Sequence, residues 1–246
     1  MTMHRPARRR RWLKWAVAGA VAVVVLAVAV PYVYIHFIEG AAPAPLSLKS
    51  SPGAASSQPG TSSSAAPGSS AGPVAGIWRV AAGSVVGYRV KEVLLGQDNI
   101  AVGRSGSVSG QLTIAGTTLT RAGFTVQMAT IHSDQSQRDA QFDGRIMAVS
   151  TYPTGTFALT RPISLAPLPA TGKVRTYSAT GLLTLHGHSR PVTFTLSAKR
   201  TGQGIMISGA IPVVFADWNI PNPSFGSFVT TQNHGVLEFL LNFGKT

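Results

Sequence analysis

The 246-residue chain contains no cysteine and only eight acidic residues. Without thiols it can form no disulfide, no thiolate zinc site, no iron–sulfur cluster and no cysteine nucleophile. The acids are spread along the sequence, and none forms an obvious carboxylate pair on one strand face for general acid–base catalysis. The phosphate loop, the G-x-S-x-G nucleophile elbow, the G-x-G-x-x-G dinucleotide motif and the H-E-x-x-H zinc motif are also missing. These absences predict a protein that is not an enzyme and that needs no cofactor.

The positive charge of the chain is unevenly placed. The formal net charge is +13, but six of the 21 basic residues lie within the first 14 positions. Residues 74–246 hold 14 basic residues against seven acids, which leaves a modest excess of +7. Their basic residues are not interleaved with exposed aromatic side chains as a nucleic-acid site requires. The charge therefore predicts no nucleic-acid partner.

Residues 15–38 contain no Asp, Glu, Lys or Arg. A helix of this length rises roughly 36 Å, enough to cross a hydrocarbon core of about 30 Å. Aromatic residues suited to the two interfacial belts lie near its ends: Trp12 and Trp15, then Tyr32 and Tyr34. The basic residues in 1–14 should remain cytoplasmic. The sequence predicts a basic cytoplasmic segment (1–14), a single-pass signal anchor in the cytoplasmic membrane (15–38) and an extracytoplasmic folded domain.

Two other interpretations of this apolar run remain. A cleaved signal peptide usually has an apolar region of about 7–15 residues, shorter than this one. The small-residue cleavage candidates near positions 40–44 are each followed by proline, which suits cleavage poorly. A buried helix of a soluble domain is the third interpretation.

Residues 39–75 form a low-complexity segment. Thirty of the 36 residues from Gly40 to Ala75 are Ala, Gly, Pro or Ser. Such a composition buries too little apolar area to offset its conformational entropy, so we expect a disordered linker. As a flexible coil it would span roughly 30–36 Å. It would serve either as a membrane leash of defined reach or as a linker of no specific length.

Residues 76–246 have the pattern of a single all-β domain. Apolar and polar side chains alternate with period two, and Gly, Pro, Asn and Ser punctuate the runs. The clearest runs are 85–91, 107–114, 124–128, 177–185, 192–198, 205–214 and 235–243. About eight strands in this pattern predict an antiparallel barrel or sandwich. Between residues 133 and 150, the spacing of Phe142, Ile146 and Val149 predicts one short amphipathic helix, with a loop as the alternative.

The strand-centre aromatics leave two interpretations of the interior open. Tyr88, Phe124, Phe157, Phe194 and Phe239 have apolar neighbours two residues away. They would fill an ordinary core, or they would line a barrel that is hollow enough for one elongated apolar ligand.

His186 and His188 are two residues apart, so they would share a face if they lay on one strand. Such a pair could ligate a metal, with His132 or His234 as a third ligand, but a turn at a strand end is the simpler interpretation and no metal site is predicted. An enzyme acting through a metal held there is the remaining catalytic hypothesis.

The run from Gly181 to Phe194, GLLTLHGHSRPVTF, resembles the most recognisable stretch of the YceI-like family. Three more segments resemble that family in the same order. They are Trp78–Val80 followed by Ser84–Val90, Ser133–Asp139 followed by Tyr152–Phe157, and Phe215–Phe225 followed by Gly235–Phe239. The resemblance covers residues 77–243.

This resemblance implies an extended, lipocalin-like antiparallel β-barrel with a helix near one end. It also implies non-catalytic binding of a long polyisoprenoid, such as a quinone or a polyprenyl lipid, in the apolar lumen. From apolarity we expect the lumen to be lined by Val86, Tyr88, Val90, Phe124, Val126, Met128, Phe157, Leu183, Leu185, Phe194 and Leu196. Candidates for its mouth are Arg138, Asp139 and Arg190, although the first two could instead brace the helix.

The sequence departs from the family pattern at three positions where that pattern has histidine: Gly83, Glu92 and Gln141. Recognition of a ligand head group would therefore differ in this chain, whereas an apolar lumen tolerates substitution. The alternative to lipid binding is an extracytoplasmic barrel with a structural or protein-binding role. The sequence does not indicate an oligomeric state.

Overall fold

The computed structural model describes residues 12, 15–23, 25, 29, 42–49, 74–94, 96–226 and 229–246. Residues 15–23 are helical. Within the described part of the chain, no helix is both long and apolar enough to cross a membrane. Most of the predicted basic segment, much of the predicted signal anchor and residues 50–73 of the predicted linker lie outside the described residues.

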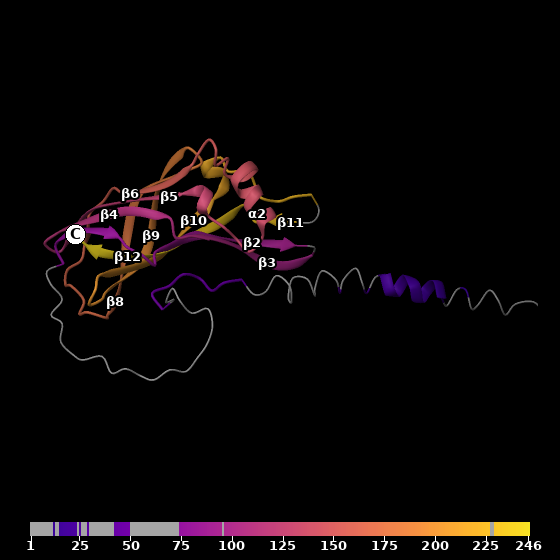
Figure 1. Ribbon diagram of the computed structural model, residues 1–246, viewed down its shortest axis with the longest axis horizontal. Coiled ribbons are helices and arrows are strands. Elements are labelled where there is room, and N and C mark those ends of the chain that lie inside the picture. Colours follow the sequence, from indigo (N-terminus) through magenta and orange to yellow (C-terminus); the bar gives the residue numbers. More distant parts are fainter. Residues whose placement is uncertain are drawn as a thin grey trace, which may run out of the picture.

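The folded domain is almost entirely β-structure (Figure 1). Its strands are β1 (Gly76–Val80), β2 (Val85–Leu94), β3 (Gln97–Ser105), β4 (Val108–Ala115), β5 (Thr118–Gln127), β6 (Thr154–Leu159), β7 (Ile163–Ser164), β8 (Val174–Leu185), β9 (His188–Arg200), β10 (Ile205–Val214), β11 (Val229–Thr231) and β12 (His234–Lys245). The helical elements are η2 (Met128–Thr130), α2 (Ser136–Gln141), the π-helical turn η3 (Phe142–Ile146) and η4 (Phe215–Trp218).

The strands close into a barrel through antiparallel pairs. The ring runs β1–β4–β5–β6–β8–β9–β10–β12 and returns from β12 to β1. β1 and β2 act as one interrupted strand. β4 pairs with β1, whereas β3, which precedes β4 in the chain, pairs with β2. In the same way, β11 and β12 follow one another along β2. The prediction of an antiparallel barrel of about eight strands is confirmed.

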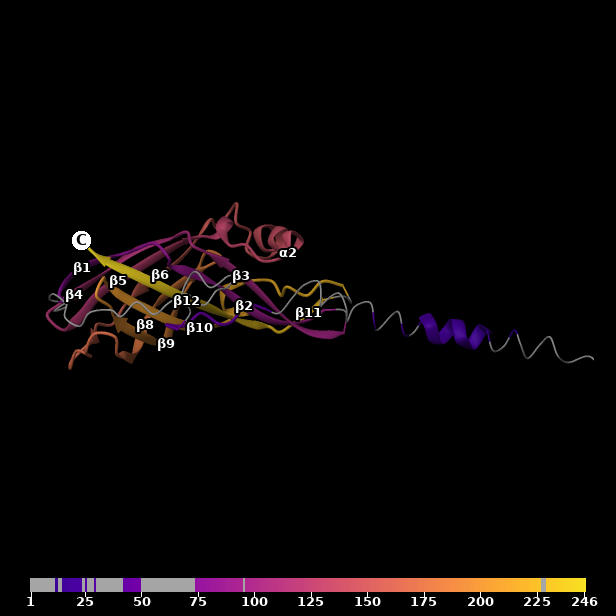
Figure 2. The ribbon, with the colours of Figure 1, turned by 60° about the horizontal axis from the view of Figure 1, so that its bottom comes forward.

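The predicted short helix is also confirmed. α2 and η3 together occupy residues 136–146, and Phe142 is buried beneath them. This helical segment lies at the end of the barrel where β2, β3 and β11 lie, and the C-terminus lies at the opposite end (Figures 1 and 2). The barrel therefore has two unlike ends, one of which carries a helix.

The alternation of side chains decides which residues face the lumen. Along β12, Phe239, Leu241 and Phe243 belong to the inner core, while Glu238 and Leu240 point to the outside. Successive side chains of a strand point to opposite faces, so the period-two pattern fixes the inner face of every strand.

Candidate functional site: a series of apolar cavities along the barrel

Three adjoining cavities lie inside the domain. A central cavity of about 140 Å³ lies in the barrel, a larger one of about 510 Å³ lies at the helical end, and a smaller one of about 60 Å³ lies beyond the central cavity. The central and large cavities share the wall residues Met128, Ile131, Leu185 and Leu237. The central and small cavities share Leu112, Leu119, Ile163, Leu196 and Ile207. The cavities thus follow one another through the domain.

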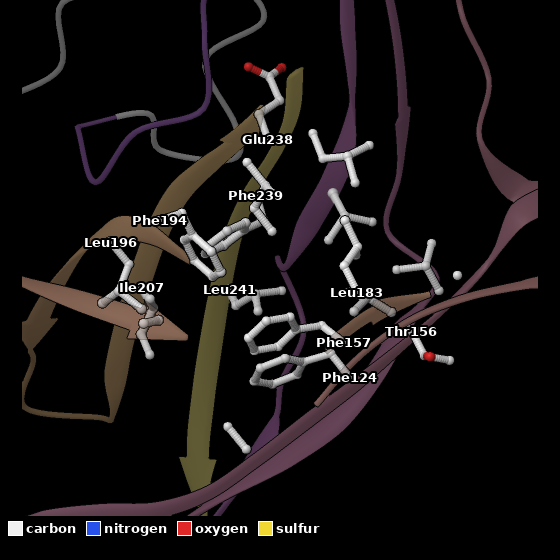
Figure 3. A pocket seen from close by; sticks show the side chains of 18 of the residues that line it. Phe124, Thr156, Phe157, Leu183, Phe194, Leu196, Ile207, Glu238, Phe239 and Leu241 are labelled. Carbon is white, nitrogen blue, oxygen red and sulfur yellow. The ribbon is translucent and has the colours of Figure 1, made fainter. Parts of the chain in front are cut away.

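The wall of the central cavity is almost wholly apolar. Among the described residues, Thr156 and Glu238 are the only polar residues that border it. The carboxylate of Glu238 points away from the aromatic rings, as Figure 3 shows. An apolar cavity of about 150 Å³ in a protein core stays free of water and admits a benzene-sized molecule. The central cavity therefore suits a hydrocarbon better than water.

The barrel stays hollow although its interior is rich in phenylalanine, because the rings lie against glycines of the wall. A methyl group added at Gly209 would lie 2.5 Å from Cζ of Phe239, and one added at Gly181 would lie 2.4 Å from Cζ of Phe157. The same arrangement places Phe124 over Gly110 and Tyr88 over Gly103. With no Cβ beneath it, each ring can lie flat on the wall instead of projecting into the lumen.

The rings also contact one another inside the lumen. The ring centroids of Phe124 and Phe157 are 6.5 Å apart, and the two rings are nearly parallel. Phe157 meets Phe194 edge-on at 5.5 Å, and Phe194 meets Phe239 edge-on at 5.9 Å. Because such contacts stabilise aromatic pairs, they hold the rings of the central cavity in defined positions (Figure 3).

The large cavity is built where the helical segment covers one end of the barrel. Its apolar wall includes Tyr88 and Val90 of β2, Phe142 of η3 and Phe215 of η4. Tyr88 stacks on Phe142 with the ring centroids 5.2 Å apart. Unlike the central cavity, it also has a polar side, formed by Glu92, Thr231, Gln135, Gln137, Arg138 and Gln141.

An ion pair largely removed from water lies on this polar side. Nη2 of Arg138 is 3.2 Å from Oε1 of Glu92, and the two side chains are only 16% and 8% exposed. Asn99 donates a hydrogen bond of 2.9 Å to the same carboxylate oxygen, and Asp134 forms a second ion pair with Arg138. Burial lowers the pKa of Arg138, but Glu92 and Asp134 outweigh it and raise the pKa overall, so the guanidinium stays charged.

Burial also raises the pKa of the Tyr88 phenol, and the nearby Arg138 opposes this only in part. The phenol is therefore neutral at ordinary pH. The large cavity thus presents a neutral hydroxyl-bearing ring and a compensated ion pair, with no isolated charge in its described wall.

The eleven apolar residues expected in the lumen all lie on the cavity walls. The central cavity has Val86, Phe124, Val126, Phe157, Leu183, Phe194 and Leu196; the large cavity has Tyr88 and Val90; Met128 and Leu185 lie in both. That these residues bind a ligand stays a prediction.

The three expected mouth residues have different surroundings. Arg138 lies on the wall of the large cavity. Asp139 is not among the cavity residues; its Oδ1 accepts hydrogen bonds from N and Oγ of Ser133, at 2.8 and 2.6 Å, and so braces the start of α2. Arg190 is exposed and donates to the carbonyl oxygen of Asp217 at 2.8 Å. That any of the three binds a ligand at the mouth of the lumen stays a prediction.

His186 and His188 do not share a strand face. Leu185 pairs with His188, and the intervening His186 and Gly187 have φ values of 47° and 74°, which makes a two-residue hairpin turn. The ring of His186 packs edge-on against Tyr152 at 4.6 Å, whereas His188 is exposed. In the described ranges, no group of three or more His, Asp or Glu side chains could hold a metal ion.

Several wall residues are not among the eleven predicted for the lumen. Phe239 and Leu241 of β12 line the central cavity, and Phe142, Ile146, Phe215 and Ile220 line the large one. The alternation along β12 and the apolar face of the predicted helix contained the signal for the first four. The positions of Phe215 and Ile220 depend on the path of the η4 loop, for which the sequence has no periodic signal.

Comparison with solved structures finds chains similar to this one. The polyisoprenoid binding domain from Saccharophagus degradans implicated in plant cell wall breakdown has a TM-score of 0.57 and 17% identity, covering 70% of this chain and 99% of that one. Burkholderia cenocepacia BcnA has a TM-score of 0.49 and 22% identity, covering 63% and 95%. The Campylobacter jejuni YceI protein has a TM-score of 0.42 and 15% identity, covering 57% and 83%. No curated protein matches the chain.

At these identities the first similarity supports the fold alone, and the lower TM-scores of the other two add no argument. The match to a sequence family is more direct. The model of the YceI-like domain matches residues 78–243, well over half of the chain, from within β1 to within β12 of the closed ring. The chain belongs to the YceI-like family.

Proposed function

We propose that this protein binds one elongated apolar lipid, of the polyisoprenoid type, without catalysing its conversion. The lipid tail would lie along the barrel through the large and central cavities. The observation that carries this proposal is the run of adjoining apolar cavities, of which the largest, about 510 Å³, is within the range of about 300–1,000 Å³ typical of small-molecule sites. The polyisoprenoid-binding domain with the same fold supports the ligand class.

The energetics favour an apolar chain. Burial of one CH₂ group contributes about 0.8 kcal/mol, so a five-carbon isoprene unit would contribute on the order of 4 kcal/mol before the cost of ordering the chain. A few units would therefore bind tightly without a directional contact. This matches a central cavity whose wall offers almost no hydrogen-bonding groups.

The head group of the lipid would lie at the polar side of the large cavity. Glu92 and Arg138 already neutralise one another there, and the Tyr88 phenol is protonated. An ionic head group would have to break the Glu92–Arg138 pair, whereas a neutral oxygen-bearing head could accept a hydrogen bond. A quinone or a polyprenol suits this environment better than a polyprenyl phosphate.

The place of the barrel in the cell is part of the same proposal. The uncharged residues 15–38 would anchor the chain in the cytoplasmic membrane, with residues 1–14 on the cytoplasmic side and the barrel outside. Treatment of intact spheroplasts with protease tests this topology. The barrel should be degraded without lysis; protection until lysis would place it in the cytoplasm.

Blocking the central cavity tests lipid binding directly. Ala179 lies on its wall and is only 1% exposed, while the preceding Ser178 on β8 points outward and is exposed. Ala179→Phe should fill the cavity, and Ser178→Phe adds the same ring to the outside as the matched control. Lipid extracted from the purified full-length protein would be quantified by mass spectrometry.

We expect a stoichiometric isoprenoid lipid in the unmodified chain and in Ser178→Phe, and at least a tenfold lower ratio of lipid to protein in Ala179→Phe. Circular dichroism would establish that both variants are folded. Equal lipid in the two folded variants, or no lipid in the unmodified chain, would contradict the proposal and favour the alternative of a barrel that binds a protein partner.

A further inference from the structure

The outer surface of the barrel carries a strip of side chains that are buried although they point away from the lumen. On β12, Leu240 is 1% exposed and Glu238 is 4% exposed, and both alternate with lumen-facing residues. Ser208, opposite Leu240 on β10, and Val102, opposite Arg89 across β2 and β3, are each 6% exposed. Side chains on the outside of a barrel normally face water, so this strip has a cover.

Residues 42–49 contact this strip at Glu238 and the neighbouring Arg89 and Arg104. Leu46 N donates to Oε2 of Glu238 at 3.2 Å, Arg89 Nη2 donates to the carbonyl oxygen of Pro43 at 2.5 Å, and Arg104 Nη2 donates to the carbonyl oxygen of Ala44. Figure 1 shows the segment beside the barrel, and Figure 3 shows the neighbourhood of Glu238. Charged side chains of the barrel thus bind three backbone groups within residues 42–49 of the predicted linker (39–75), whose disorder stays a prediction.

The three charged side chains form one platform, which we call the strap site: Arg89, Arg104 and Glu238. Glu238 is 3.4 Å from Nε of Arg89 and 3.0 Å from Nη2 of Arg104, so one buried carboxylate orients two guanidinium groups. Each guanidinium then has a further N–H group directed at a carbonyl of the segment. The site comes from β2, β3 and β12, which are adjacent in the sheet.

The sequence of the segment suits this site. Residues 42–49 read APAPLSLK. Proline favours an extended backbone whose carbonyl groups have no internal partner, and it reduces the entropy lost when the chain is fixed. Pro43 and Pro45 have no N–H group, so the Leu46 amide is the first donor after them, and Glu238 accepts from it. Folded domains that bind proline-rich peptides exploit the same preformed extended backbone.

We propose that the strap site is a peptide-docking surface for the chain's own residues 42–49, and that this docking sets how far the barrel stands from the membrane. The second part rests on the proposed membrane anchor. With residue 42 docked, the four residues beyond position 38 reach at most about 14 Å. Without docking, residues 39–75 would behave as a coil that spans roughly 30–36 Å. The docked residues 42–49, which we call the strap, would thus replace a long flexible tether by a short one.

The absence of cysteine makes the docking directly measurable in the full-length chain. Lys49→Cys on the strap and Thr195→Cys on the outer face of β9 replace exposed residues and would carry spin labels. Leu46→Pro removes the amide that donates to Glu238 and leaves the barrel unchanged. Leu46→Ala loses the same leucine side chain but keeps the amide, so it is the matched control.

In detergent micelles we expect one narrow distribution of label distances in the parent chain and in Leu46→Ala, and a distribution at least twice as wide in Leu46→Pro. A broad distribution in the parent chain, or a narrow one in Leu46→Pro, would overturn the docking. This measurement needs no bilayer, so it is independent of whether the membrane anchor is correct.

A second measurement, in lipid nanodiscs, tests the tether. Energy transfer from a fluorophore at Thr195→Cys to acceptors on the lipid head groups should be lower in Leu46→Pro than in Leu46→Ala. Equal transfer in the two variants, with the micelle distances different, would overturn the role in membrane distance while leaving the docking intact. Failure of the chain to enter nanodiscs would count against the membrane anchor and not against the strap site.

Discussion

Gly209→Ala tests whether the flat packing of aromatic rings on glycine keeps the lumen open. The new methyl group would lie 2.5, 3.0 and 3.3 Å from three atoms of the Phe239 ring, and no backbone atom is among these contacts. Carbon atoms prefer separations of about 3.5–4.0 Å, so the ring has to move by about 1 Å or more. The new methyl group lies between the wall and the Phe239 ring, so the ring would tilt toward the lumen and narrow the central cavity beside Phe194.

The expected cost combines two opposing effects. Overpacking of a core costs about 1–3 kcal/mol, while replacing glycine by alanine stabilises by about 0.4–1 kcal/mol through the unfolded chain. We therefore expect a net loss of free energy of unfolding on the order of 1 kcal/mol, measured by urea denaturation, together with reduced lipid content. Gly123→Ala is the matched control, since the nearest atom to its methyl group would be the Phe157 carbonyl oxygen at 3.9 Å.

A double-mutant cycle decides whether the collision with the Phe239 ring causes the loss of stability in Gly209→Ala. Phe239→Leu removes the colliding atoms, so Gly209→Ala should cost little when it is added to Phe239→Leu, and the coupling energy should be about 0.5–3 kcal/mol. Strictly additive effects of the two substitutions would refute the reasoning. So would a Gly209→Ala protein as stable as the Gly123→Ala control and equally loaded with lipid.

Two further predictions concern the polar side of the large cavity. Burial raises the pKa of Tyr88 above its ordinary value near 10, so as the pH rises the unfolded chain loses the phenol proton before the folded chain does. The contribution of Tyr88 to the free energy of unfolding should therefore be complete below about pH 10 and fall as the pH rises further. Tyr88→Phe should reduce that fall in urea titrations. Arg138→Leu leaves the Glu92 carboxylate buried beside Asn99 and should lower the free energy of unfolding by about 3–5 kcal/mol, against little change for the exposed Arg161→Leu. In Glu92→Gln/Arg138→Leu most of that loss should be recovered, and a double variant as unstable as Arg138→Leu would contradict the ion-pair explanation.

Much of the fold could be predicted from the sequence because side-chain alternation reports the strand face directly. The lumen-facing residues of β2, β5, β6, β8 and β9 were predicted from apolarity alone. An error of one residue would have exchanged each of these side chains with its outward neighbour. Alternation says nothing about side chains held by backbone groups. Asp139 accepts a hydrogen bond from Ser133, and Arg190 donates one to the Asp217 carbonyl; neither contact could be predicted from the alternation.

The strap was missed for a related reason. Composition describes how much apolar area a segment can bury on its own, and residues 42–49 have little. What holds them is hydrogen bonding by Arg89, Arg104 and Glu238, three side chains from strands far away in the sequence. A possible signal was Glu238 itself, an acid in the middle of an apolar strand.

Whether the barrel is filled or hollow depends on register, which composition does not contain. Phe239 faces Gly209 and Tyr88 faces Gly103 as direct cross-strand partners, so each aromatic ring has a glycine beside it. In the third pair, Phe124 lies opposite Gly110 only because the pairing of β4 with β5 contains a β-bulge.

The turn between β4 and β5 pairs Ala115 with Thr118, and a regular hairpin from that turn would set Phe124 opposite Ser109. The bulge between Thr113 and Ile114 shifts the register by one residue and sets it opposite Gly110 instead. Partners directly opposite one another point to the same side of the sheet. Without the bulge, the Phe124 ring would therefore meet a serine side chain on the lumen side rather than a bare backbone. One extra residue in a strand thus separates a barrel with a hollow interior from one whose interior its own aromatic ring would narrow.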